Sequence, residues 1–134
     1  MKYLLDTNIC IYLIKHKPPQ VLEHFQKYAF SDIGVSAITV AELQYGVKKS
    51  HQIEKNKKAL ELFLLPLVIA EFDNHAASIY GDIRAELESL GKPIGALDTL
   101  IVAHALSLNI TLVTNNTKEF SRIPRLAIAN WTTR

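Results

Sequence analysis

The sequence is poor in cysteine and has no long apolar run. Its 134 residues include one cysteine, Cys10, which excludes an intramolecular disulfide framework and a CxxC metal or redox site. No apolar stretch approaches the roughly 20 residues of a membrane-spanning helix. Asp6 interrupts the first apolar run before a signal peptide could form. These absences predict a reduced, cytoplasmic protein without a membrane segment.

Motifs of several common enzyme classes are also missing. None of the five histidines has another histidine four residues away, and the chain contains no G-x-S-x-G elbow or Walker loop. Hydrophobic residues make up 49% and charged residues 21% of the chain, proportions that exclude wholesale disorder. A chain of this length holds one core, so we expect residues 1–134 to form a single domain.

Short apolar runs alternate with segments of helical periodicity, which is typical of an α/β protein. This pattern favours a three-layer α/β/α domain with a central parallel sheet of four to five short strands. The predicted strands are residues 2–5, 33–36, 67–69, 111–114 and, more weakly, 126–129. The predicted helices are residues 9–17, 21–29, 38–49, 53–65, 76–90 and 97–108. In the last helix, residues 97, 100, 101, 104, 105 and 108 trace one apolar face.

Four polar residues lie where this sheet would place them at a common edge. Asp6 ends the first strand, and Glu42 lies in the first turns of the helix after the second strand. Asp98 opens the helix that leads into the fourth strand, and Asn116 follows that strand. Ligands of open parallel sheets bind at the carboxyl ends of the strands. We therefore expect the four side chains to converge.

Three clustered carboxylates repel one another unless a cation lies between them or their pKa values rise. Oxygen-only ligands favour Mg²⁺ or Mn²⁺ over zinc. On this hypothesis Asp6 and Asp98 bind the ion directly, and Glu42 binds an ion or orients the attacking water. Asn116 would hold a water or a phosphate. The matching chemistry is metal-assisted phosphodiester hydrolysis.

Each acid also has a purely structural interpretation. Asp6 can cap the following helix, and Glu42 can complete a capping box with Thr39. A favourable interaction with the helix dipole would explain Asp98. Two other functions also stay open at this point. One is a phosphomonoesterase with Asp6 as nucleophile, although such enzymes usually have a second acid at the position that Asn8 occupies here. The other is a non-catalytic domain that binds RNA or protein.

The remaining candidates are weaker. His104 lies on the apolar face of its helix and Cys10 lies among apolar residues, so both are expected in the core. Tyr45 is expected in the core rather than stacked on a base. Apart from Asp6, Glu42 and Asp98, the chain has 15 basic and 10 acidic residues, a mild excess that suits a polyanion or a solvated surface. Lysines near the predicted element ends could meet phosphates, but Lys48-Lys49 also fits a charged helix end.

Four segments together resemble the successive motifs of PIN-domain ribonucleases, and most closely the VapC toxins of bacterial toxin–antitoxin pairs. The segments are Leu4–Asn8, Ser36–Gly46, Gly91–Asp98 and Val113–Phe120. The resemblance implies a Mg²⁺- or Mn²⁺-dependent endoribonuclease that cuts structured RNA, specifically the anticodon stem-loop of initiator tRNA. It also implies a homodimer whose activity is inhibited by a VapB antitoxin. The chain would contact DNA only indirectly, through that antitoxin. The apolar helices around residues 47–65 offer a surface for such a partner or a second copy.

The resemblance also assigns roles to individual residues. Asp6 and Asp98 match the metal-binding acids of the family, and Glu42 matches the acid on the helix of the second motif. Many PIN domains have Asp at the position of Asn116, so we expect one tightly held ion, with a second absent or recruited with substrate. Glu119 would replace that acid only if its loop bent inward, and we expect it to be exposed.

Overall fold

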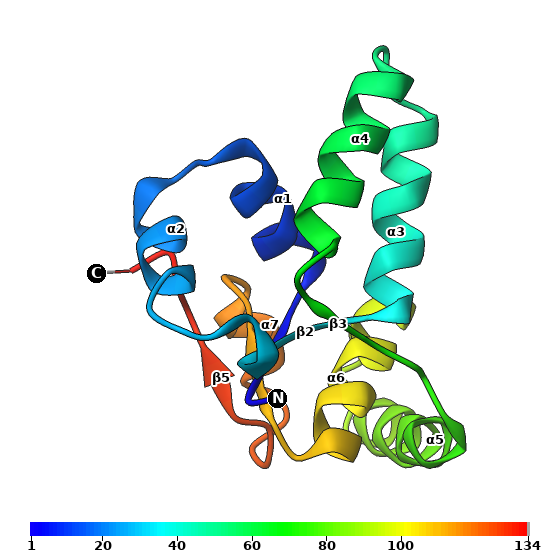
Figure 1. Ribbon diagram of the computed structural model, residues 1–134. Helices are drawn as coiled ribbons and strands as arrows, with labels where there is room; N and C mark the ends of the chain where they lie inside the picture. The colour runs from blue at the N-terminus through cyan, green and yellow to red at the C-terminus, as the bar shows by residue number, and fades with distance from the viewer. Residues whose placement is uncertain (134) are drawn as a thin grey trace.

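The computed structural model describes residues 1–133 and contains one parallel sheet in this range, with strand order β3-β2-β1-β4-β5 (Figure 1). Every neighbouring pair of strands is parallel, which confirms the predicted architecture and the weak fifth strand. The strands are β1 (Tyr3–Leu5), β2 (Ile33–Ser36), β3 (Val68–Ala70), β4 (Thr111–Val113) and β5 (Ile128–Ala129).

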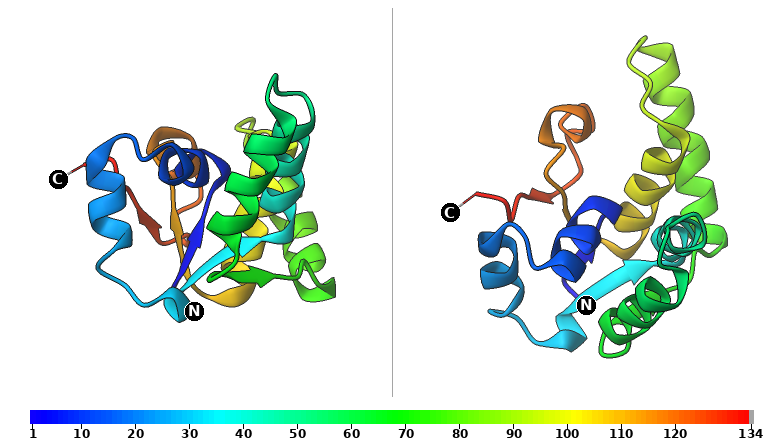
Figure 2. Two further views of the ribbon diagram at one scale, coloured as in Figure 1. Left: turned by 45° about the horizontal axis from the view of Figure 1, so that its top comes forward. Right: turned by 90° about the horizontal axis from the view of Figure 1, so that it is seen from above.

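Helices cover both faces of the sheet (Figure 2). On β1 and β4, Leu5 and Val113 pack into one core cluster, and Leu4 and Leu112 into another on the opposite face. Residues of α1, α2, α3 and α4 build the first cluster, and residues of α5, α6 and α7 build the second. The helices are α1 (Thr7–Lys15), α2 (Pro19–Phe25), α3 (Ala37–Lys48), α4 (Ile53–Leu64), α5 (Asn74–Ser89), α6 (Ala96–Leu108) and α7 (Thr117–Phe120). Side chains alternate across a strand, so these apolar runs supply both cores.

The end of α5 follows the sequence closely. Gly91 has φ 68°, the left-handed conformation that glycine adopts without strain. The amide of Gly91 donates to the Glu88 carbonyl, and the amide of Lys92 donates to the Leu87 carbonyl at 2.9 Å. This pair of bonds is the Schellman motif, and it ends the helix where the glycine predicts.

Helix α6 differs from its prediction. Val102 and Ala103 are buried, whereas Leu97 and Leu108, which were expected on the apolar face, are exposed. The middle of α6 packs against α5, α3 and β4, so most of its circumference is covered there and only its ends meet solvent. A single apolar stripe is therefore the wrong description of this helix. The short α7 and a 3₁₀ turn at Phe30–Asp32 were also not predicted.

Helices α3 and α4 form an antiparallel hairpin that extends beyond the sheet (Figure 1). The connection between them is four residues long, from Lys49 to Gln52. Within residues 1–133, no helix combines the length and apolar character needed to cross a membrane.

Candidate active site

The predicted edge of the sheet is a topological switch point. The chain runs from β1 outward through β2 to β3 and then returns to place β4 on the other side of β1. Ligands of open parallel sheets bind in the crevice at such a reversal. Asp6 follows β1 directly, and its amide donates to the Val113 carbonyl of β4 at 3.0 Å, which fixes the acid at the crevice.

Asp6 is both a helix cap and a member of an acidic cluster. Its buried carboxylate accepts a 2.9 Å hydrogen bond from the amide of Ile9, so the capping interpretation is confirmed. Burial raises the pKa of Asp6, and the charge of Glu42 raises it further. Hydrogen bonds from the Thr114 hydroxyl and the Ile9 amide act in the opposite direction. Capping by itself does not account for the effect of the Glu42 charge on the pKa of Asp6, so the capping bond does not exclude a role for Asp6 in the site.

Glu42 does not belong to a capping box. The residue that caps α3 is Ser36, whose Oγ accepts from the amide of Ile38 at 3.1 Å. The Glu42 Oε1 instead accepts a 2.8 Å hydrogen bond from the hydroxyl of Thr7. The capping-box interpretation with Thr39 is therefore wrong, because α3 begins earlier than that motif requires. The half-buried Glu42 faces the first turn of α1.

Asp98 lies in the first turn of α6 and is half-buried. Burial, the neighbouring Glu119 carboxylate and then the charges of Asp6 and Glu42 together raise the pKa of Asp98 to about 7. The Thr99 hydroxyl donates to the Gly95 carbonyl at 2.8 Å and closes this turn. Acids from four separate segments thus share one electrostatic environment at the sheet edge.

Glu119 is the residue that sequence reasoning placed incorrectly. Its Oε2 accepts a 3.0 Å hydrogen bond from the side-chain amide of Asn116, and its Oε1 is buried with no hydrogen-bond partner among the described residues. The expectation of an exposed Glu119 is wrong because residues 117–120 form α7, whose buried Phe120 anchors that turn in the core. The sequence did contain a signal for this contact. Asn116 and Glu119 are three residues apart, and side chains at that spacing are neighbours when the segment forms a helical turn.

The donor set suits a hard divalent cation. Asp6, Glu42, Asp98 and Glu119 offer only oxygen atoms, which Mg²⁺ and Mn²⁺ prefer. The unpartnered Oε1 of Glu119 and the pKa of Asp98, raised by burial and by the neighbouring carboxylates, both indicate a cluster short of positive charge. Across residues 1–133, no three acidic, histidine or cysteine side chains already surround a common point as metal ligands. Three of these carboxylates accept hydrogen bonds: Glu42 from Thr7, Asp6 from Ile9, and Glu119 from Asn116.

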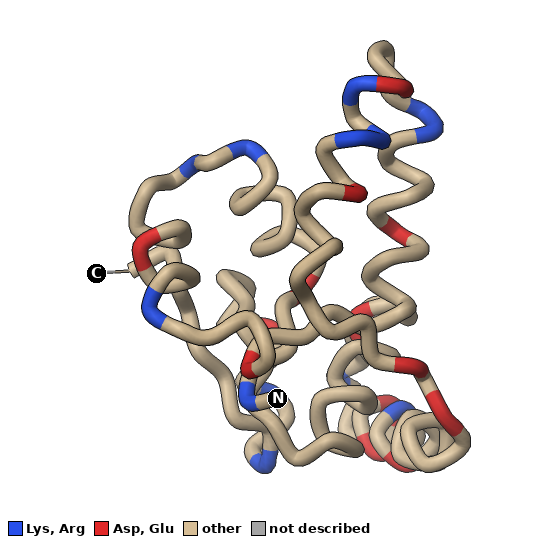
Figure 3. The backbone as a smooth tube through the Cα atoms, in the orientation of Figure 1, with Lys and Arg blue, Asp and Glu red and all other residues tan. Residues whose placement is uncertain are grey.

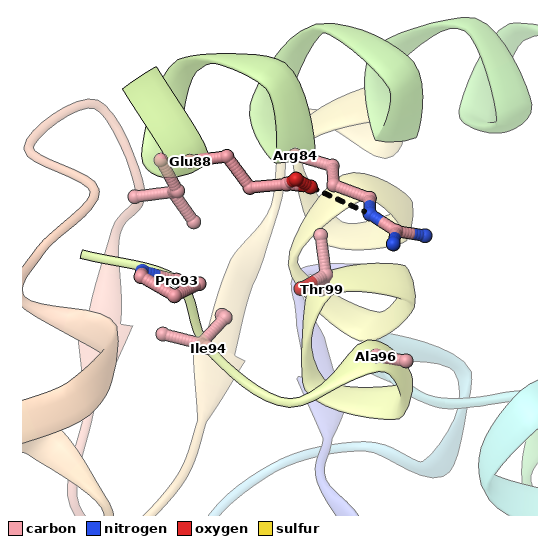
Figure 4. Close-up of a pocket in the computed structure, with 7 residues that line it drawn as sticks. Arg84, Glu88, Pro93, Ile94, Ala96 and Thr99 are labelled. Atoms are coloured by element: carbon pink, nitrogen blue, oxygen red, sulfur yellow. Dashed lines mark hydrogen bonds and ion pairs between the residues drawn. The ribbon is translucent and has the colours of Figure 1, made fainter. Parts of the chain in front are cut away.

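The acidic cluster does not line the cavity beside α5. A cavity of about 130 Å³ lies between α5 and the segment before α6 (Figure 4), and the Arg84–Glu88 ion pair of 3.1 Å borders it. None of the four acids lines this cavity. A groove of about 340 Å³ begins at Thr7 and Glu42 and continues between α1, α3 and α4. Half-buried acids beside an open groove remain reachable for a large substrate.

Three further residues were assigned to the core from sequence. Cys10 is fully buried, as expected. His104 is buried too, and its Nδ1 lies 2.7 Å from the Ser36 Oγ, while the Phe72 ring meets it edge-on. Tyr45 contradicts the core expectation, because 66% of it is exposed. Asn8, the position at which a phosphomonoesterase would carry its second acid, is exposed and neutral.

Comparisons with known proteins identify the family of the chain. The PIN domain family matches residues 3–126. Ribonuclease VapC2 of Rickettsia felis is 47% identical over 132 residues, which cover 98% of both chains. The tRNA(fMet)-specific endonuclease VapC of Shigella flexneri is 41% identical over 131 residues, again 98% of each. The structure of DNA-bound VapBC from Salmonella typhimurium superposes with a TM-score of 0.93 at 43% identity, covering 98% of each chain. The chain therefore belongs to the PIN-domain family and, within it, to the VapC ribonucleases.

Proposed function

We propose that this chain is the toxin of a toxin–antitoxin pair, a divalent-metal-dependent endoribonuclease that acts in the cytoplasm on structured RNA. The observation that carries the proposal is that the carboxylates of Glu119, Asp6 and Glu42 lie near enough to Asp98 to raise its pKa beyond the effect of burial, beside the switch point of the sheet. The similarity to the Shigella tRNA(fMet)-specific endonuclease supports initiator tRNA as the substrate.

In this proposal Asp6 and Asp98 hold a Mg²⁺ or Mn²⁺ ion, and Glu42 either shares it or orients the attacking water. Such an ion supplies an activated water and neutralises charge on the phosphate. Glu119 adds the carboxylate that Asn116 does not provide. The Thr7 hydroxyl orients Glu42, and the Asn116 amide orients Glu119. Asn116 is then a positioning residue for the acid rather than a ligand itself.

The neighbouring grooves suit an antitoxin segment. The groove that begins at Thr7 and Glu42 shares Ile14 and Ala59 with a second groove of about 370 Å³ between α1, α2 and α4. The walls of the second groove are mainly apolar, with Leu13, Leu22 and Phe25 among them. An amphipathic segment bound along both grooves would end at Glu42 and obstruct the site. The solved VapBC complexes of similar chains support such a partner.

The decisive experiment is cleavage of total tRNA by the purified protein. We expect one or a few new RNA ends that depend on Mg²⁺ or Mn²⁺ and disappear when EDTA is added. Mapping those ends identifies the tRNA and the bond. Cleavage that persists in EDTA would contradict the metal-dependent mechanism, and intact initiator tRNA beside another cut tRNA would contradict the substrate assignment.

A further inference from the structure

The end of the α3–α4 hairpin concentrates positive charge. We call residues 48–58 the hairpin tip. It contains five lysines and one glutamate, a net charge of +4, whereas the whole chain carries +2. The remainder of the chain therefore carries −2, and the lysines gather at the far end of the hairpin (Figure 3). All five are exposed: Lys48, Lys49, Lys55, Lys57 and Lys58.

Helix-end electrostatics account for only part of this charge. Lys48 and Lys49 lie at the carboxyl end of α3, where cations are favoured. Lys55, Lys57 and Lys58 lie in the first half of α4, on the side of its positive dipole end, where they gain nothing from the dipole. The ion pairs found within residues 1–133 are Arg84–Glu88 and Arg125–Glu86, so no carboxylate pairs with the tip lysines. Their mutual repulsion is relieved when a polyanion binds.

An exposed aromatic ring lies beside these cations. Tyr45 is 66% exposed, and the Lys49 ammonium lies 5.0 Å from the centroid of its ring. Single-stranded and looped RNA is bound by exposed aromatic rings on which bases stack, combined with cations that contact the phosphates. Tyr45 and the hairpin tip bring both features together on one element.

The aromatic ring and the tip continue directly from the acidic cluster. Glu42, Tyr45 and Lys49 follow one another along one side of α3 at spacings of three and four residues. The rise of an α-helix places Lys49 about 10 Å beyond Glu42 along the axis. The groove that begins at Thr7 and Glu42 also reaches Ser50 and Asn56 at the tip. An RNA backbone at the acids can therefore extend to the lysines without leaving the surface of the hairpin.

We infer that the hairpin tip, together with Tyr45, is a second RNA contact that binds the backbone of a structured substrate away from the bond that is cut. The inference rests on the proposed function and adds to it the surface that captures the RNA. The tip contributes to substrate binding and leaves the reacting groups unchanged. Its lysines therefore act on KM and on the salt dependence of binding, and kcat at saturating RNA stays the same.

The test compares two doubly substituted proteins of equal charge. Lys57→Gln/Lys58→Gln removes two tip cations, and Lys2→Gln/Lys27→Gln removes two exposed cations elsewhere. Cleavage of tRNA gives kcat and KM, and binding of labelled tRNA to each protein in an Asp6→Asn background gives Kd across a salt series. For the tip variant we expect KM and Kd to rise about tenfold and the salt slope to fall by about 2. The control variant should match the parent.

Each alternative outcome has a separate meaning. Failure of the unsubstituted protein to cut any tRNA would reject the proposed function itself. Normal cleavage by that protein, with equal KM and salt slope in the tip and control variants, would reject only the RNA contact. Weaker antitoxin binding by the tip variant with unchanged Kd for tRNA would assign the surface to a protein partner and overturn the inference. As a further test, Tyr45→Ala should raise KM while Tyr45→Phe should not, because Phe retains the stacking ring.

Discussion

The hydroxyl of Thr7 donates a 2.8 Å hydrogen bond to the carboxylate of Glu42, across 35 residues of sequence. Thr7 directly follows Asp6, so this bond ties the acid on α3 to the acid at the end of β1. The relative placement of two acids thus depends on a contact between α1 and α3.

Replacing this hydroxyl should impair catalysis more than folding. Thr7→Val keeps the shape of the side chain and removes the donor to Glu42, which is half-buried. We expect kcat for tRNA cleavage to fall about tenfold, in proportion to one lost orienting hydrogen bond of about 1–1.5 kcal/mol. Thr7→Ser retains the hydroxyl and should recover most of the rate. Equal rates for the Val and Ser variants would show that the bond has no catalytic importance.

Substitutions at Asp6 should separate its two roles. Asn caps helices about as well as Asp, so Asp6→Asn should abolish cleavage while the urea-unfolding free energy stays close to that of the parent. Asp6→Ala removes the cap as well and should cost about 1 kcal/mol of stability in addition. Mg²⁺ should raise the Tm of the parent but not of Asp6→Asn, because only a protein that binds the ion is stabilised by it. Retained cleavage by a folded Asp6→Asn protein would exclude this acid from the mechanism.

Glu119 should prove to be part of the site despite its absence from the expected ligands. Glu119→Gln keeps the contact with the Asn116 amide but removes a charge beside Asp98. We expect a lower pKa for Asp98, measured by carboxyl carbon NMR in metal-free protein, and a higher Mg²⁺ concentration for half-maximal cleavage. Glu88→Gln is the matched control, since Glu88 is exposed and pairs with Arg84. An unchanged Mg²⁺ requirement would show that Glu119 does not contact the ion.

His104 should make stability depend on pH in a defined direction. Burial lowers the pKa of His104 below 6.5, while the Glu71 backbone and the charge of Asp73 act against this effect. The unfolded chain then binds the proton more readily than the folded chain. The contribution of His104 to the free energy of unfolding is therefore fully present above pH 6.5 and is lost as the pH falls toward the pKa of His104 in the folded state. Urea unfolding between pH 7.5 and 5.5 should therefore show a steeper loss in the parent than in His104→Asn. The exposed His51→Gln control should retain the slope of the parent.

Several parts of this architecture could be predicted because they depend on neighbouring residues. The apolar run before Asp6 predicted a buried strand, Gly91 predicted the end of α5, and the alternation of strands and helices predicted a parallel sheet. The expectation that Asp6 and Asp98 lie at one edge of the sheet followed from a topological rule that needs no side-chain detail, and the charge of Asp6 does raise the pKa of Asp98. The four motifs, which follow one another in the expected order along the chain, indicated the family, and the comparisons then showed it independently.

Other parts depended on contacts between distant segments. The capping box at Glu42 was excluded by the start of α3 at Ala37, and the carboxylate of Glu42 instead accepts a hydrogen bond from the hydroxyl of Thr7. Tyr45 has apolar neighbours in sequence, but Leu43 and Val47 are the residues of α3 that enter the core. Tyr45 lies two residues from each, on the opposite side of the helix, and is therefore exposed.

By itself the sequence determined which elements form and at which edge of the sheet the acids lie, since strand burial, helix ends and chain direction are encoded locally. Only the tertiary structure decided which carboxylates face one another and turned Glu119 inward behind the buried Phe120. The physical reason is that side-chain direction at this edge is set by burial and by hydrogen bonds between segments up to about a hundred residues apart, and residue spacing carries no record of those bonds.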